Sequence, residues 1–298
     1  MKPMSIMMNE LTDSELDTDR YIQYRPRIEI QGQAPAPTHQ VTVHDHTGRL
    51  RQIKIAGEFP LTIKVDGQEV ITLMTLGTDP QELALGYLRN QRLVKSIEEI
   101  ESVRVLWDTQ TISVSTVHGN GIDDLLEKTS RRTISSGCGQ GTLFSCTLDV
   151  IYETRLPETQ VRQSTLYGVL KEMSHRNLIY KEAGSVHTCG LFQGKEALMV
   201  VEDIGRHNAA DAIAGRMWLK GMPGENKIFY TTGRLTSEII MKTAMMGIPV
   251  LLSRSSVTRM GLEVAEDLGM TLIGRAKAKR FLVYAGLDNL RMDAGKLE

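Results

Sequence analysis

One cysteine of this chain, Cys138, lies in a glycine-rich stretch that favours an exposed, reactive thiol over a buried one. Cys138 lies in the stretch Ser-Ser-Gly-Cys-Gly-Gln-Gly at residues 135–141, where three glycines within five residues leave the backbone mobile and the thiol poorly shielded. An accessible thiolate is a nucleophile, and Arg131 and Arg132 just upstream would lower the thiol pKa if they approach it. The alternative is a free cysteine in a turn without a chemical role. The other two cysteines, Cys146 and Cys189, are expected to be buried.

A second concentration of polar residues lies where a predicted strand meets a predicted helix. The apolar run 197–201 is followed by Glu-Asp-Ile-Gly-Arg-His-Asn at 202–208, and then by apolar residues at helical spacing. Arg206, His207 and Asn208 would therefore lie in or beside the first turn of a helix, where unpaired backbone N–H groups favour a phosphate or a carboxylate. A polar helix cap with a structural histidine is the alternative.

Three further strand ends carry hydroxyl or basic side chains. Thr-Thr-Gly-Arg at 231–234 and Ser-Arg-Ser-Ser at 253–256 each leave a predicted strand and enter a helix, and a basic run at 275–280 follows another strand. Together these ends favour a ligand rich in pyrophosphate, although helix caps or solvated faces would explain each one taken alone. The candidate ligand-binding residues are Arg206, His207, Asn208, Thr232, Gly233, Arg234, Ser253, Arg275, Ala276, Lys277, Ala278, Lys279 and Arg280.

The elements that must position these residues change character along the chain. Residues 1–38 lack periodicity and predict a flexible arm, whereas 39–157 alternate apolar and polar residues and predict a smaller β-rich domain carrying the cysteine loop. Within it, Asp66-Gly67 predicts a hairpin turn, and Asp79, Pro80 and Glu82 predict a capped helix start. Residues 158–298 predict an α/β/α domain. Its helices are expected at 164–178, 206–220, 236–246 and 257–268, and its strands near 197–201, 227–231, 248–252 and 270–274.

Composition narrows the classes of function. The chain has 298 residues, with 35 basic and 36 acidic side chains, so its charge gives no footprint for nucleic acid or a membrane surface. It has no apolar run long enough to span a bilayer, and its N-terminus does not resemble a secretory signal. Three cysteines, an odd number, are typical of a reducing compartment. We therefore expect a cytoplasmic protein.

Several of these stretches, in the same order, resemble signatures of the formate dehydrogenase accessory sulfurtransferase family, the FdhD/NarQ type. The resemblance extends over about residues 40–285, and no single short motif carries it. Its segments are Thr-Ile-Ser-Ser-Gly-Cys-Gly at 133–139, Ala-Gly-Ser-Val-His-Thr-Cys at 183–189, Glu-Asp-Ile-Gly-Arg-His-Asn-Ala-Ala-Asp at 202–211, and the tract from Tyr-Thr-Thr-Gly-Arg at 230–234 to Ile-Pro-Val-Leu-Leu-Ser at 248–253.

The resemblance implies a fold and a function. The fold is α/β, with a smaller β-rich N-terminal domain and a cytidine-deaminase-like three-layer α/β/α domain. The implied activity is sulfur transfer: Cys138 would accept persulfide sulfur from a cysteine desulfurase and pass it to the molybdenum or tungsten bis(molybdopterin guanine dinucleotide) cofactor, for formate dehydrogenase. The cofactor is then a bound substrate, and the protein has no tightly bound metal of its own. A homodimer is also implied.

The chain departs from the family pattern at two places. Many members carry two cysteines in the loop, whereas this chain has Cys138 alone, so a relay between neighbouring cysteines is not available. In the segment implied to bind the cofactor, Arg275 replaces an aromatic residue and Lys277 replaces an arginine, which keeps charge and loses stacking. Two other classes stay open: a cofactor chaperone with an inert Cys138, and a zinc-dependent deaminase-like hydrolase using His187, Cys189 and Cys138, although the chain has no Cys-x-x-Cys pair.

Overall fold

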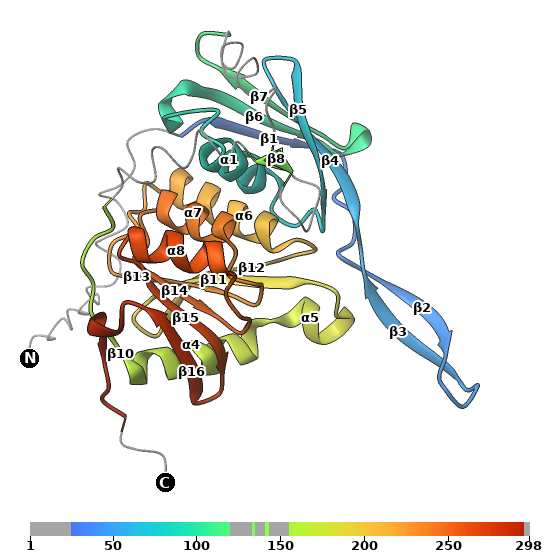
Figure 1. Cartoon of the computed structure of the whole chain (residues 1–298). Coiled ribbons are helices and arrows are strands. Elements are labelled where there is room, and N and C mark those ends of the chain that lie inside the picture. The colour runs from blue at the N-terminus through green and yellow to red at the C-terminus, as the bar shows by residue number, and fades with distance from the viewer. Residues whose placement is uncertain (1–24, 120–132, 135–140, 143–154, 295–298) are drawn as a thin grey trace, which may run out of the picture.

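Two β-sheets with helices between and around them form the body of the molecule (Figure 1). The computed structural model describes residues 25–119, 133–134, 141–142 and 155–294. Cys138, Cys146, Arg131 and Arg132 lie outside these residues. The five-stranded sheet consists, in spatial order, of β1 (Arg27–Gln31), β6 (Ile100–Leu106), β7 (Thr111–Thr116), β4 (Phe59–Val65) and β5 (Gln68–Thr75).

The larger sheet brings several strand ends to one edge. Its six strands, in spatial order, are β12 (Glu196–Asp203), β11 (His187–Gln193), β13 (Lys227–Thr231), β14 (Val250–Ser253), β15 (Thr271–Lys277) and β16 (Arg280–Ala285). β13, β14 and β15 are parallel, and β11 is antiparallel to both of its neighbours. The start of β11 therefore meets the carboxyl ends of β12, β13 and β14, which is where α/β sheets commonly bind ligands.

Helices cover both faces of the six-stranded sheet, which gives three layers (Figure 1). The helices on one face are α6 (Arg206–Leu219), α7 (Ser237–Met245) and α8 (Arg259–Asp267), and α4 (Gln163–Arg176) covers the other, followed by the short α5 (Leu178–Ala183). Consecutive residues of β13 show the division, because Phe229 packs in the core on the α6 side and Ile228 and Tyr230 in the core on the α4 side. The expected α/β/α arrangement is confirmed.

Helix α1 (Pro80–Asn90) joins the two sheets by packing closely on α6. Gly86 and Gly215 lie where the two backbones cross: a Cβ added to Gly86 would come 1.7 Å from the carbonyl oxygen of Asp211. Beside this crossing, Lys242 of α7 donates to both carboxylate oxygens of Asp211 at 2.7 Å, and Asn90 donates to one of them at 2.7 Å. One apolar core continues from the five-stranded sheet through α1 and α6 to the larger sheet.

A two-stranded hairpin extends away from this body (Figure 1). It consists of β2 (Thr38–His44) and β3 (Leu50–Ala56), and at its base Lys54 pairs with Glu182 of α5. The remaining short elements are the strands β8 (Thr133–Ile134), β9 (Gly141–Thr142), β10 (Val161–Arg162) and β17 (Leu290–Arg291), and the 3-10 turns Ile97–Glu99, Trp107–Thr109 and Leu287–Asn289. No helix in the described ranges is long and apolar enough to cross a membrane.

Most predicted elements are present, and two local expectations hold only in part. The Asp66-Gly67 turn is confirmed, with φ of 48° and 84° between β4 and β5, as a primed hairpin turn requires. The expected arm is ordered in its last part, because β1 pairs parallel with β6 as the edge of the sheet. Asp79 is the N-cap residue of α1 and Pro80 begins the helix, as expected, but the Asp79 side chain makes no cap, since its carboxylate pairs with Arg216 of α6 instead.

Candidate functional site

The predicted ligand-binding residues fall into two places on the larger sheet. Arg206, His207, Asn208, Thr232, Gly233, Arg234 and Ser253 lie at the edge where β11 begins and β12, β13 and β14 end. The run 275–280 lies at the end of β15, in the turn to β16 and at the start of β16. It borders a groove on the α4 face.

At the sheet edge, an imidazole faces a hydroxyl and two guanidinium groups. Nδ1 of His187 lies 3.2 Å from the hydroxyl oxygen of Thr232, which also accepts the backbone N–H of Thr188 at 3.1 Å. Arg206 packs over Gly233, where a Cβ would come 2.3 Å from its Cδ. Partial burial, together with the positive charges of Arg206 and Arg234, lowers the pKa of His187, so its imidazole is neutral at pH 7. Such a cluster attracts an anion.

Other predicted residues of this edge are buried and hold the loops in place. Nε2 of His207 lies 3.1 Å from a carboxylate oxygen of Glu238 in α7, and burial, aided by nearby positive charges, lowers the pKa of His207 to about 2. Ser253 is buried and donates to the carbonyl oxygen of Gly233 at 2.6 Å. Thr232 and Arg234 are therefore the members of this edge set that reach solvent, while His207 and Ser253 support the loops beneath them.

Asp203 at the end of β12 ties this edge to the five-stranded sheet. Its carboxylate accepts the side-chain amide of Asn208 at 2.8 Å, and it also accepts the hydroxyl of Thr75 and the backbone N–H of Leu76 just after β5. The amide of Asn208 in turn donates to the carbonyl oxygen of Met74 at 2.7 Å. Asn208 thus fixes the start of α6 against β5. Sequence reasoning placed Asn208 at the ligand, and its buried partners lie instead between the two sheets.

The buried cysteine at this edge is held as a thiol. Sγ of Cys189 lies 3.4 Å from the hydroxyl oxygen of Thr231, and burial raises the pKa of Cys189 to about 12. A thiol in this state is a poor nucleophile and a poor metal ligand. Within the residues that the structure describes, no three His, Cys, Asp or Glu side chains gather closely enough to hold a metal ion. The expected burial of Cys189 is confirmed.

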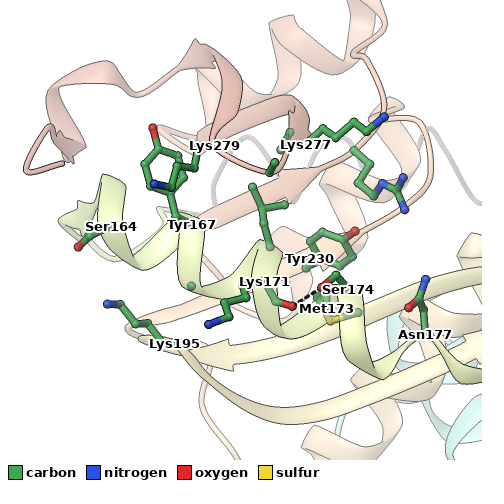
Figure 2. Close-up of a pocket in the computed structure, with 15 residues that line it drawn as sticks. Ser164, Tyr167, Lys171, Met173, Ser174, Asn177, Lys195, Tyr230, Lys277 and Lys279 are labelled. Carbon is green, nitrogen blue, oxygen red and sulfur yellow. Dashed lines mark hydrogen bonds between the residues drawn. The ribbon is translucent and has the colours of Figure 1, made fainter. Parts of the chain in front are cut away.

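A basic groove runs along α4, on the face of the larger sheet that α6, α7 and α8 do not cover. It has a volume of about 620 Å³ and lies between α4 and the β15–β16 turn, with Tyr230 on its floor (Figure 2). Its lining includes five cationic side chains and no carboxylate. The five are Lys171, Lys195, Arg254, Lys277 and Lys279. Leu170, Met173 and Ala276 make the floor apolar, so the groove offers both an apolar surface and positive charge, which suits a ligand with a ring system and phosphates.

The groove contains four predicted residues and several that sequence reasoning missed. Ala276, Lys277, Ala278 and Lys279 line it, whereas Arg275 and Arg280 are exposed beside it. Lys171 lies in α4 and Lys195 in the β11–β12 turn, and neither belongs to a motif. Helical spacing could have placed Lys171 on the solvent side of α4, but no local signal shows that α4 faces the β15–β16 turn.

The structure describes the residues that flank the cysteine loop on both sides. Thr133 pairs with Thr142 and Ile134 with Gly141 in an antiparallel ladder, so the ends of the loop are joined. The predicted catalytic Cys138 lies between them, outside the described residues, and its role stays a prediction.

Comparison with known proteins gives consistent matches. A model of the FdhD/NarQ family matches residues 56–291. The sulfur carrier protein FdhD of Bacillus subtilis is 29% identical over 239 residues, which is 80% of this chain and 90% of that protein. FdhD of Listeria monocytogenes serotype 4b is 29% identical over 258 residues, 85% and 98% of the two chains. A crystal structure described as a formate dehydrogenase accessory protein from Desulfotalea psychrophila superposes with a TM-score of 0.68 at 26% identity. The match covers 85% of this chain and 98% of that one.

Proposed function

Because the chain belongs to the FdhD/NarQ family, we propose that it is a cytoplasmic sulfur carrier required for formate dehydrogenase activity. Cys138 accepts sulfur from a cysteine desulfurase and passes it to the bis(molybdopterin guanine dinucleotide) cofactor of molybdenum or tungsten. In the first step the Cys138 thiolate attacks the outer sulfur of the desulfurase persulfide. A new S–S bond forms on Cys138, the desulfurase S–S bond breaks, and the desulfurase cysteine leaves as a thiolate.

The burial and the raised pKa of the Cys189 thiol support the choice of Cys138 as the carrier cysteine. The Cys189 thiol is fully buried, and its pKa of about 12 leaves almost no thiolate at neutral pH. Cys138, in contrast, follows and precedes glycine in a loop whose two ends are joined by β8 and β9. A short loop closed at its base can present a thiol to two partners in turn, the desulfurase and then the acceptor.

The observation that carries the acceptor half of the proposal is the charge of the groove. Five cations and no carboxylate line about 620 Å³. A guanine dinucleotide arm has two phosphates, which cations attract, and a base, which an apolar floor with tyrosine rings accommodates. Lys277 and Lys279, from the run that the resemblance assigns to the cofactor, are the residues we expect to contact the phosphates. At the sheet edge where β13 ends, Arg206 and Arg234 then supply positive potential, and the Thr232 hydroxyl supplies a hydrogen-bonding group.

The test of the sulfur step is intact-protein mass after incubation with a cysteine desulfurase and cysteine. We expect a gain of one sulfur in the wild type that reductant removes, and none in Cys138→Ala. Cys189→Ala and Cys146→Ala are the matched controls and should still gain the sulfur. If the desulfurase is active and the wild type gains no sulfur, or if Cys138→Ala gains as much as the wild type, Cys138 is not the carrier.

A cofactor chaperone without sulfur transfer is the second candidate, and the groove favours it equally. It predicts binding of the cofactor with an unreactive Cys138. Formate dehydrogenase activation in cells distinguishes the two, since Cys138→Ala should abolish activation by a sulfur carrier and leave activation by a chaperone unchanged. The homodimer that the family resemblance implies belongs to the same proposal, and light scattering on the purified protein measures it.

A further inference from the structure

A glycine in the middle of α4 marks an unassigned part of the groove. Gly168 lies well inside the helix, where glycine costs about 1 kcal/mol relative to alanine. The structure supplies a reason for its presence: a Cβ at Gly168 would lie 2.7 Å from Cγ and 2.8 Å from Cδ of Lys195. The aliphatic chain of Lys195 therefore lies directly against the helix backbone (Figure 2). Any larger residue at 168 would displace it.

This contact directs the side chain of Lys195 from the β11–β12 turn toward α4. Lys195 lies in the turn between β11 and β12, where a lysine side chain would normally extend into water. Here its aliphatic carbons lie against α4 while the residue as a whole stays exposed, and it lines the groove together with Lys171, which comes from the next turn of that helix. Across the described ranges, neither ammonium forms an ion pair with a carboxylate. Two lysines that line one groove without a paired carboxylate give it a positive potential, which attracts an anion.

The groove is positive on its opposite side as well. Lys277 and Lys279 come from β15 and the β15–β16 turn, and Figure 2 shows both across the groove from Lys171 and Lys195. We propose that Lys195, seated on Gly168, forms with Lys171 a phosphate-binding wall on the α4 side, so that a diphosphate group is held between two pairs of lysines. This inference rests on the proposed function for the identity of the ligand, a guanine dinucleotide arm. It adds the α4 wall, which no motif and no resemblance assigns.

The test is the affinity for GDP and for inorganic pyrophosphate, measured by titration calorimetry at low ionic strength. Lys171→Gln and Lys195→Gln should each weaken GDP binding about tenfold, equal to about 1.4 kcal/mol. Gly168→Ala removes no charge, yet it should weaken GDP binding several-fold because the new methyl group displaces Lys195. The double variant Gly168→Ala/Lys195→Gln should bind no more weakly than Lys195→Gln alone, since both changes act on one contact. Lys95→Gln, an exposed lysine just after α1, is the control and should bind as the wild type does.

The outcomes separate this inference from the proposed function. If Lys277→Gln weakens GDP binding while Gly168→Ala, Lys171→Gln and Lys195→Gln do not, the α4 wall is wrong and the groove remains the ligand site. If the wild type binds neither GDP nor pyrophosphate, the wall is also overturned, whereas the sulfur gain on Cys138 still tests the carrier step independently. If the wall is correct, cofactor released from a formate dehydrogenase should displace GDP; failure to displace it would assign the wall to a free nucleoside diphosphate.

Discussion

Replacing Gly86 with alanine should destabilise the fold, although alanine is the better helix former. The new Cβ would lie 1.7 Å from the carbonyl oxygen of Asp211 and 2.7 Å from the backbone nitrogen of Gly215. Both are backbone atoms of α6 and cannot rotate away. A carbon and an oxygen need more than 3 Å between them, so α1 and α6 must separate by about 1.5 Å at this point.

The magnitude follows from what that separation disturbs. Overpacking of a close contact costs about 1–3 kcal/mol. The shift also moves Asp211 relative to Asn90 of α1, and loss of a hydrogen bond to a buried charged group costs about 1.5–3 kcal/mol. Against these, alanine regains about 1 kcal/mol of helix propensity. A net loss of about 4 kcal/mol is expected, a large share of the roughly 5–15 kcal/mol that separates most folded domains from the unfolded chain.

Thermal unfolding followed by circular dichroism measures this effect. A loss of about 4 kcal/mol corresponds to a fall in Tm of about 8–16 °C for a protein of this size. Gly168→Ala in α4 is the matched control: there the Cβ meets only the flexible chain of Lys195, so Tm should stay or rise. If Gly86→Ala leaves Tm unchanged or raises it as the control does, the close approach of the two helix backbones does not hold.

Three further predictions concern the sheet edge. The pKa of His207 is about 2 in the folded protein and 6.5 in the unfolded chain, so below pH 6.5 only the unfolded chain gains the proton. The free energy of unfolding therefore falls by up to about 1.4 kcal/mol for each pH unit below 6.5. Urea titrations at several pH values should show this slope reduced in His207→Gln. Brief iodoacetamide treatment of the native protein at pH 8 should leave Cys189 unmodified, and treatment in denaturant should modify it. Gly233→Ala should displace Arg206 and raise the pKa of His187 measured by NMR; an unchanged pKa would contradict the assigned contact.

Local pattern was sufficient for the elements of the larger sheet. The apolar runs at 227–231 and 248–252 form β13 and β14, and the helices expected at 206–220 and 236–246 are present within a residue or two. These strands are buried on both faces, so their composition alone identifies them. The Asp66-Gly67 turn was equally predictable, because the positive φ of both residues is a local requirement.

Features set by distant segments were not predictable in the same way. Asp79 has the sequence context of a helix cap, but Arg216, 137 residues away, takes its carboxylate. Ile28 and Ile30 alternate as in a strand, yet only pairing with β6 orders them, and a five-residue edge strand gives a weak signal by itself. The groove depends on which face of α4 meets the β15–β16 turn, and this is a property of tertiary packing.

The β2–β3 hairpin has a consequence for the behaviour of the protein in concentrated solution. Within the described structure it pairs with no other strand, so both of its outer edges present backbone N–H and C=O groups to water, next to the exposed side chains of Leu50, Ile53 and Ile55. Such a ribbon invites strand-by-strand association. Arg51 and Lys54 interrupt its apolar residues, and pairing with an identical ribbon would remove water from these two cations and from the carboxylates of Asp45 and Glu182 with which they pair. The solubility of the protein should therefore depend on these two cations more than on any part of its core.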